Sequence, residues 1–271
     1  MKYVKKIIAT SHVDSYGDMF ALEALESLVE QIKTMYIPVN IEHDPRIPPQ
    51  GRLISAKLIM LEDGEYAVEA VSEIFEESDK IELVNNSREM PLYTYDIDTL
   101  GIHYDLTYKD PESQKIIKEI STVFNATPQE EVKKALEPIS ILTIGGAFIL
   151  GAVAGGFFNK LGSDAWDALK EKLKRLLKKQ GEKSNERLLT FKFTLISEDS
   201  KTISEIILTN PNDDDIESFF NHGFKQLDDI SPKYTAPSIG LKKIVFCYSH
   251  GKLSLEYGVR KDAVPIYPKT T

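Results

Sequence analysis

His43 and Asp44, side by side at the end of a short strand-like run, are the residues in this sequence best suited to chemistry. An imidazole can take the proton of a serine hydroxyl and make that oxygen a nucleophile, provided that the two groups lie within hydrogen-bond reach. His43 is therefore a candidate general base. The alternative is a polar residue at a strand end that hydrogen-bonds to Asp44 or to the backbone.

Two other roles for this region stay open in the sequence. Carboxylates together with an imidazole suit several divalent ions. The residues that could gather in this way are Asp14, Asp18, His43 and Asp44. A solvated turn that caps a helix explains the two earlier aspartates equally well, so we expect no metal site. Arg46 and Arg52 could hold a carboxylate of a substrate or of the protein itself.

The composition is that of an ordinary globular protein, with 271 residues, 42% hydrophobic and 28% charged. This length predicts about two domains. The formal net charge of −9 disfavours nucleic acid as a partner, because binding to phosphates needs a basic face. The single cysteine, Cys247, excludes an internal disulfide and fits a reducing compartment. The apolar run Ile7–Ala9 is too short for a signal peptide, so we expect a cytoplasmic protein.

The elements that would position His43 are short strands around one helix. Apolar residues recur at spacings of three and four from Met19 to Tyr36, which predicts a helix with Asp18 as its N-cap. Asp63-Gly64 between two strand-like runs indicates a hairpin. The predicted strands are 3–10, 39–42, 52–61, 65–75 and part of 91–108. The first 110 residues therefore read as a mostly antiparallel β-α-β-β-β-β domain.

This pattern resembles the phage prohead (capsid maturation) protease family, which shares its fold with the herpesvirus assemblins. The family has an Asp-containing turn after the first strand, a helix, a strand that ends in His-Asp, and a hairpin that begins at glycine. The matching residues are Asp14, Gly17 and Asp18, then His43 and Asp44, then Gly51 and Arg52, then Asp63 and Gly64. The resemblance covers residues 1–108.

The resemblance implies a serine-type endopeptidase with a catalytic set of His43 as base, Asp44 as the acidic member and a serine on a later strand. The corresponding segment, residues 91–97, contains no serine. Ser87 is the nearest serine and our candidate nucleophile, and Thr94 is the alternative. Without either of them, the domain would be a catalytically inactive relative of the family.

The middle of the chain holds an apolar run of twenty uncharged residues, 139–158. That length matches a membrane-spanning helix, and the small residues Gly146, Gly151 and Gly155 allow close helix packing. We predict a Gly-rich apolar helix, either associated with a membrane or buried between domains. A basic amphipathic helix follows at 163–180, which would suit an anionic lipid surface with Trp166 at the interface, or would pack by its leucines.

The predicted fold class is α+β in three parts. These are a prohead-protease-like domain at 1–110, a helical connector at 111–187, and a C-terminal β-β-α-β-β interaction domain at 188–271. No cofactor is expected. The partner would be a protein or peptide, and a homo-oligomer stays open. The rival to a peptidase is a non-enzymatic, membrane-associated effector or sensor, conceivably in antiphage defence, whose protease-like domain recognises a partner.

Overall fold

The structure is a computed structural model with two compact units. The first comprises Met1–Leu92 and Val259–Tyr267, and the second comprises Tyr93–Gly258 and Pro268–Thr271. The structure describes all residues except 1, 14–18, 42–43, 77–80, 84–85, 97–99, 131–138, 162, 182–185, 237–239 and 269–271. The sequence predicts three domains, at 1–110, 111–187 and 188–271. That domain division stays a prediction.

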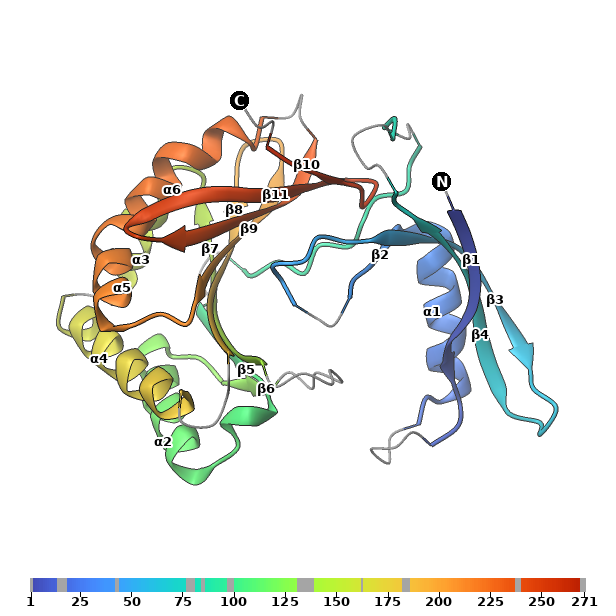
Figure 1. The fold of residues 1–271 in the computed structure, drawn as a ribbon, viewed down its shortest axis with the longest axis horizontal. Coiled ribbons are helices and arrows are strands. Elements are labelled where there is room, and N and C mark those ends of the chain that lie inside the picture. The colour runs from blue at the N-terminus through green and yellow to red at the C-terminus, as the bar shows by residue number, and fades with distance from the viewer. Residues whose placement is uncertain are drawn as a thin grey trace. The chain divides into compact units, whose positions relative to one another are not determined.

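The first unit is a four-stranded antiparallel sheet with one helix on a face (Figure 1). The sequence predicts this mostly antiparallel arrangement, but its fifth strand was wrongly placed, because the strand within 91–108 pairs with strands of the second unit instead. Its strand order is β1-β4-β3-β2. The elements are β1 (Lys2–Thr10), α1 (Leu22–Thr34), β2 (Ile37–Val39), β3 (Gly51–Met60) and β4 (Tyr66–Ile74). The predicted hairpin joins β3 to β4, where Gly64 takes a positive φ of 88°.

Helix α1 is stabilised by the packing of its apolar stripe on the sheet. Leu25, Val29 and Ile32 are buried against β3 and β4. The predicted N-cap was wrong, because the helix begins at Leu22 and its N-cap residue is Ala21, which makes no side-chain capping bond.

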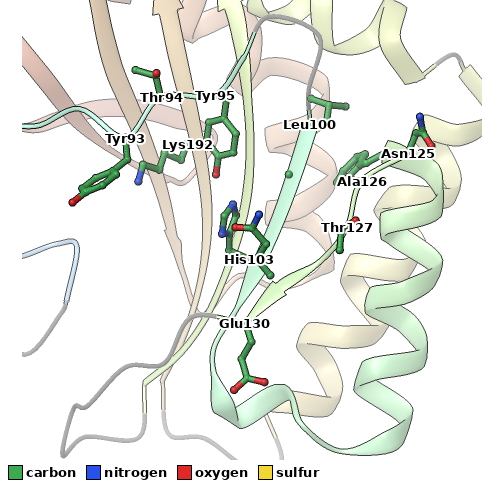
Figure 2. A pocket seen from close by; sticks show the side chains of 13 residues that line it. Tyr93, Thr94, Tyr95, Leu100, His103, Asn125, Ala126, Thr127, Glu130 and Lys192 are labelled. Carbon is green, nitrogen blue, oxygen red and sulfur yellow. The ribbon is translucent and has the colours of Figure 1, made fainter. Parts of the chain in front are cut away.

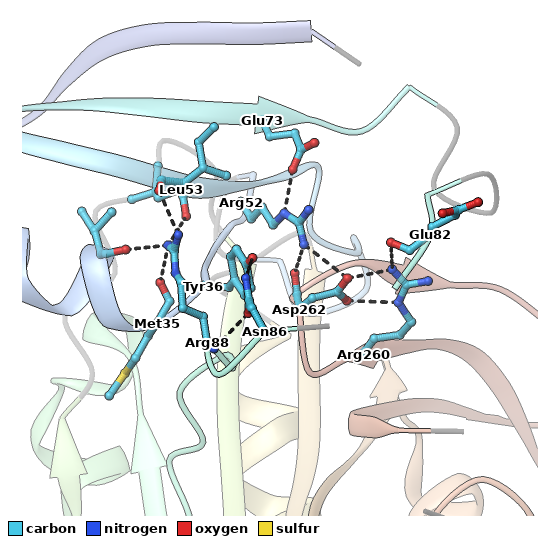
Figure 3. Close-up of polar contacts among 12 residues, drawn as sticks. Met35, Tyr36, Arg52, Leu53, Glu73, Glu82, Asn86, Arg88, Arg260 and Asp262 are labelled. Atoms are coloured by element: carbon cyan, nitrogen blue, oxygen red, sulfur yellow. Dashed lines mark hydrogen bonds and ion pairs between the residues drawn. The ribbon is translucent and has the colours of Figure 1, made fainter. Parts of the chain in front are cut away.

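Within the first unit, a buried ion network joins the strands of Met1–Leu92 to the late segment Val259–Tyr267 (Figure 3). Arg52 is 3% exposed and donates from Nε to Glu73 at 2.7 Å. Its Nη1 contacts the Asp262 carboxylate at 3.3 Å and the Asp262 carbonyl at 2.8 Å. Arg260 holds the same carboxylate at 2.8 Å. Burial makes each charge dependent on its partners, because an unpaired buried charge is strongly destabilising.

The other sheet is mixed and eight-stranded, of order β12-β11-β10-β9-β8-β7-β5-β6, and the second unit holds all of it except β12 and the last two residues of β11. The strands of this sheet are β5 (Leu100–Tyr104), β6 (Gln129–Glu130), β7 (Ile139–Ile149), β8 (Glu186–Ile196), β9 (Lys201–Thr209), β10 (Leu241–Ser249), β11 (Lys252–Arg260) and β12 (Pro265–Ile266). The α-helices of the second unit are α2 (Pro111–Phe124), α3 (Val153–Leu161), α4 (Ser163–Gln180), α5 (Asp213–Ser218) and α6 (Phe224–Ile230). These helices lie on one face of the sheet (Figure 1).

The predicted Gly-rich helix over 139–158 was wrong. Residues Ile139–Ile149 form β7, a turn at Gly151 follows with φ of 79°, and only then does α3 begin. Strand β7 pairs in parallel with β8 and antiparallel with β5, and ten of its eleven residues are not exposed. A strand covered on both faces is apolar throughout, so it lacks the alternation that identifies a half-buried strand. Within the described part of the chain, no helix has the length and apolarity to cross a membrane.

Aromatic side chains fill the space between this sheet and its helices. Phe157 of α3 stacks on Phe224 of α6 with ring centroids 5.0 Å apart, and Phe191 of β8 stacks on Phe219 at 4.6 Å. Trp166 is 8% exposed and packs edge-on against Phe220 at 4.9 Å. The expectation that Trp166 lies at a lipid interface was therefore wrong, because its ring belongs to this core.

The predicted amphipathic helix 163–180 is confirmed as α4 (Ser163–Gln180). Its leucines are buried, and its lysines pair with carboxylates of neighbouring helices. Lys170 and Lys174 contact Glu217 at 2.8 and 3.1 Å, Lys172 contacts Glu119 at 2.6 Å, and Lys179 bonds to Asp110 at 2.5 Å. The basic face is thus largely neutralised within the second unit, which favours the interpretation of a packed surface helix.

The predicted β-β-α-β-β order of the C-terminal region is confirmed in β8, β9, the helical run from Asp213 to Ile230, β10 and β11. Asn212 and Asp215 form a capping box at the start of that run. His250 and Gly251 both take positive φ, as a tight hairpin turn requires. This region is not a separate sheet, because β7 pairs with β8 along its length.

Replacing Arg52 tests the buried network. Arg52→Met leaves Glu73 and Asp262 without their shared cation, so we expect the free energy of unfolding to fall by about 3–5 kcal/mol. Lys57→Met is the control, because Lys57 is 63% exposed and surface ion pairs such as its pair with Glu69 contribute little to stability. Urea unfolding of the full chain measures both changes, and equal losses in the two variants would contradict the assignment.

The ion pairs of α4 predict a dependence of stability on pH. Hydrogen bonds from Lys170 and Lys174 hold the pKa of Glu217 below its usual value of 4.5. A lowered carboxyl pKa adds stability above the unfolded pKa and loses it as the pH falls through the folded pKa. Glu217→Gln should therefore lose less stability than wild type between about pH 5 and pH 3. Unfolding curves across that range test this, with Glu198→Gln, an exposed residue, expected to behave as wild type.

Candidate functional site

The structure describes only part of the predicted catalytic set. His43 lies outside the described residues, as do Asp14, Gly17 and Asp18. The geometry between the predicted base and any hydroxyl therefore stays a prediction. No group of three or more His, Cys, Asp or Glu side chains that could hold a metal ion gathers among the residues that are described.

Asp44 is buried and already engaged by its neighbour. Its carboxylate accepts from the Arg46 backbone N at 2.9 Å and from the Arg46 guanidinium at 2.6–3.1 Å. Arg46 thus holds a carboxylate of the protein itself, which is one of the two roles that the sequence left open. The same is true of Arg52, whose partners are Glu73 and Asp262.

Ser87 lies in an exposed bend. Its two neighbours, Asn86 and Arg88, are anchored (Figure 3). Asn86 accepts from the Arg88 backbone N at 2.9 Å and donates to the Tyr36 hydroxyl at 2.7 Å. The Arg88 guanidinium lies over the Tyr36 ring, 4.3 Å from its centroid, and donates to the carbonyls of Ile32 and Met35. This anchoring sets the position of the bend and leaves the serine side chain in solvent.

Thr94, the alternative nucleophile, belongs to the second unit and lines a pocket of about 840 Å³ (Figure 2). Segment 93–95 forms one wall, His103 projects from β5, and the end of α2 with the residues that follow it, 124–127, forms the opposite wall. Small-molecule sites commonly enclose ~300–1,000 Å³. No motif in the sequence predicts this pocket.

Tyr95, which lines the pocket, lies against two glycines. Gly101 of β5 and Gly145 of β7 are direct cross-strand partners. A Cβ atom on Gly145 would overlap the Tyr95 ring, and one on Gly101 would come within 2.9 Å of it. The Tyr95 backbone N donates to Thr194 Oγ1 at 2.9 Å, and the ring stands edge-on to His103 at 5.8 Å. Glycines within strands allow such close approach of another segment.

Lys192 supplies the charge of this wall. It is the β8 residue directly opposite Gly145, so Gly101, Gly145 and Lys192 form one row across three strands. Its cross-strand neighbour on β9, Glu205, forms an ion pair with Lys243. Among the side chains that the structure describes, no carboxylate lies within ion-pair distance of Lys192. The ammonium group is thus a cation at a pocket wall between Tyr93 and Tyr95 (Figure 2).

At the end of the pocket opposite Lys192, the acidic side chain is neutralised by an ion pair. Glu130 of β6 lines it and pairs with Lys109 at 2.9 Å. Asn125 takes a positive φ of 49° as the C-cap of α2, which turns the chain towards β6. The site therefore combines aromatic rings, a neutralised acidic group and one cation, and this set of groups suits a ligand that carries both a flat ring and a negative charge.

The comparisons with known proteins identify no relative: no family model, no curated protein and no solved structure matches this chain. The resemblance of residues 1–108 to prohead proteases therefore stays a prediction. The four-stranded antiparallel sheet with its helix is shown by the structure itself.

The contact between the Tyr95 ring and Gly145 can be tested by substitution. Gly145→Ala places a methyl group in the space of the ring, so we expect a loss of about 1–3 kcal/mol in unfolding free energy. Tyr95→Ala should remove most of this penalty, so the effects of the two changes should not add. Gly155→Ala is the control, because that helical glycine has open space and should gain up to ~1 kcal/mol. Additive losses in the double variant would refute the contact.

Proposed function

We propose that this protein is a non-enzymatic recognition protein whose second unit binds a small ligand with a planar ring and an anionic group. The observation that carries the proposal is Lys192, a cation on a pocket wall between two tyrosines, for which the described residues supply no carboxylate partner. A bound anion would provide that partner. The proposal belongs to the recognition class of function that the sequence left as the rival to catalysis.

The side chains that line the pocket indicate which chemical groups a ligand would carry. The rings of Tyr93 and Tyr95 offer surface for stacking, which contributes most when a ligand ring can offset against them. A carboxylate or phosphate beside Lys192 would form a charge-assisted hydrogen bond, which is shorter and stronger than a neutral one. The hydroxyls and amides of Thr94, Asn125 and Thr127 can orient further polar groups.

Phenyl phosphate is a suitable probe, with benzamidine as its cationic counterpart of similar size. We expect phenyl phosphate to bind the full chain and to raise its melting temperature, because it carries the ring and the anion, and benzamidine to do neither. Lys192→Gln should weaken phenyl phosphate binding at least about tenfold, the effect of ~1.4 kcal/mol for a lost charged partner. Isothermal titration calorimetry measures the affinities.

Lys201→Gln is the matched control for charge. Lys201 is an exposed lysine on β9 outside the pocket lining, so its replacement should leave the affinity unchanged. Equal binding of phenyl phosphate and benzamidine, or equal effects of the two lysine variants, would reject the anion site.

The endopeptidase hypothesis remains the second candidate, supported by the sequence order of His43-Asp44 and the hairpin that follows. It requires an activated serine. We expect a fluorophosphonate probe not to label Ser87, because the serine lies in an exposed bend and the Asp44 carboxylate is engaged by Arg46. Labelling that disappears in both Ser87→Ala and His43→Ala would establish the peptidase instead.

A further inference from the structure

Strand β1 is an open edge of the first unit. The order β1-β4-β3-β2 places it at one end of the sheet, where β4 occupies its inner edge. No strand in the described part of the chain pairs with its outer edge. Along Lys2–Thr10, alternate residues thus direct unpaired backbone donors and acceptors outward, where they form a template for another strand.

This strand is also poorly covered by its own unit. None of its nine side chains is buried, whereas four of the nine in β4 are. Tyr3 is 60% exposed, Ile7 49% and Ile8 40%. Ordering a strand costs conformational entropy, which burial of apolar side chains ordinarily offsets. An edge strand with exposed apolar residues and no buried side chain is therefore an incomplete part of a sheet.

The charges on β1 indicate what would complete it. Lys5 pairs with Glu69 at 2.8 Å, but Lys57 shares that carboxylate at 3.2 Å. Lys2 and Lys6 have no ion pair with any described residue. Because side chains alternate along a strand, Lys2 and Lys6 lie on one face, and Tyr3, Lys5 and Ile7 lie on the other.

A second copy of this chain is a poor occupant of the edge. Antiparallel pairing of two β1 strands would bring three lysines from each copy to one seam, and like charges across strands are destabilising. Lysines on edge strands commonly prevent such self-pairing. They do not oppose a strand of the opposite charge.

We propose that β1 is completed by an extended acidic segment of a partner protein. The segment pairs with the outer edge of β1, places carboxylates beside Lys2 and Lys6, and places apolar side chains beside Tyr3 and Ile7. Main-chain hydrogen bonds give such strand addition its affinity, and the alternating side chains give it selectivity. The proposal concerns the first unit and is independent of the pocket in the second.

The probe is the peptide acetyl-TVETVVET-amide, in which two glutamates stand four residues apart to match Lys2 and Lys6 in an antiparallel register. We expect it to bind the full chain, to shift the amide resonances of β1 in NMR spectra, and to bind more weakly as salt is added. The peptide acetyl-TVKTVVKT-amide should not bind. Two further versions of the acidic peptide carry N-methyl groups on alternate amides, one on the odd-numbered and one on the even-numbered residues. One of the two should lose binding, because only one of these sets of amides donates hydrogen bonds to β1.

Charge reversal on the protein gives the matched test. The double variant Lys2→Glu, Lys6→Glu should weaken the acidic peptide at least about tenfold and should gain affinity for the lysine peptide. Lys201→Glu with Lys252→Glu makes the same change of net charge in the second unit and should bind as wild type. The milder pair Lys2→Gln, Lys6→Gln replaces the first variant if that one does not fold.

Equal binding of the two peptides, unchanged β1 resonances, or full binding of both N-methylated series would overturn the proposal. Loss of binding in the Lys201 and Lys252 variant to the same extent would also overturn it, because net charge alone would then account for the effect.

Discussion

A tyrosine ring can lie directly on two neighbouring strands only where neither strand has a side chain at that point. Gly101 and Gly145 meet this condition as cross-strand partners, and Tyr95 occupies the space above them. The bond from the Tyr95 backbone to Thr194 holds the segment against the sheet. The place of Tyr95 in the pocket wall thus depends on this pair of missing side chains, and the register of β7 with β8 places Lys192 in the same row.

The charges of the molecule fall into two groups with different consequences. Arg52, Glu73 and Asp262 are buried and satisfy one another, so they fix how distant segments meet. The lysines of α4 likewise neutralise carboxylates of neighbouring helices. Lys192 differs because its nearest cross-strand carboxylate, Glu205, pairs with Lys243. The paired charges stabilise the fold, whereas Lys192 is the charge that we propose to bind a ligand.

Local patterns predicted the local structure. The stripes in α1 and α4 and the hairpin at Gly64 each depend on residues within a few positions of one another. The prediction for run 139–158 failed because an apolar segment without periodicity fits a buried strand as well as a helix. Its partner β8 begins at Glu186, 37 positions after β7 ends at Ile149, so no local pattern reveals the pairing. Lys192 and His103 could not be linked from sequence because only strand register brings them together, although glycines inside β-branched runs were a usable signal.

The most direct test of the central contact is a nuclear Overhauser experiment on the full chain, with selective labelling of tyrosine and glycine. Cross-peaks from the Tyr95 ring protons to the Hα protons of both Gly101 and Gly145 are the expected result, because the ring lies on these two residues. A Tyr95 ring with solvent-like shifts and no cross-peak to either glycine would contradict the pocket and the recognition site built on it.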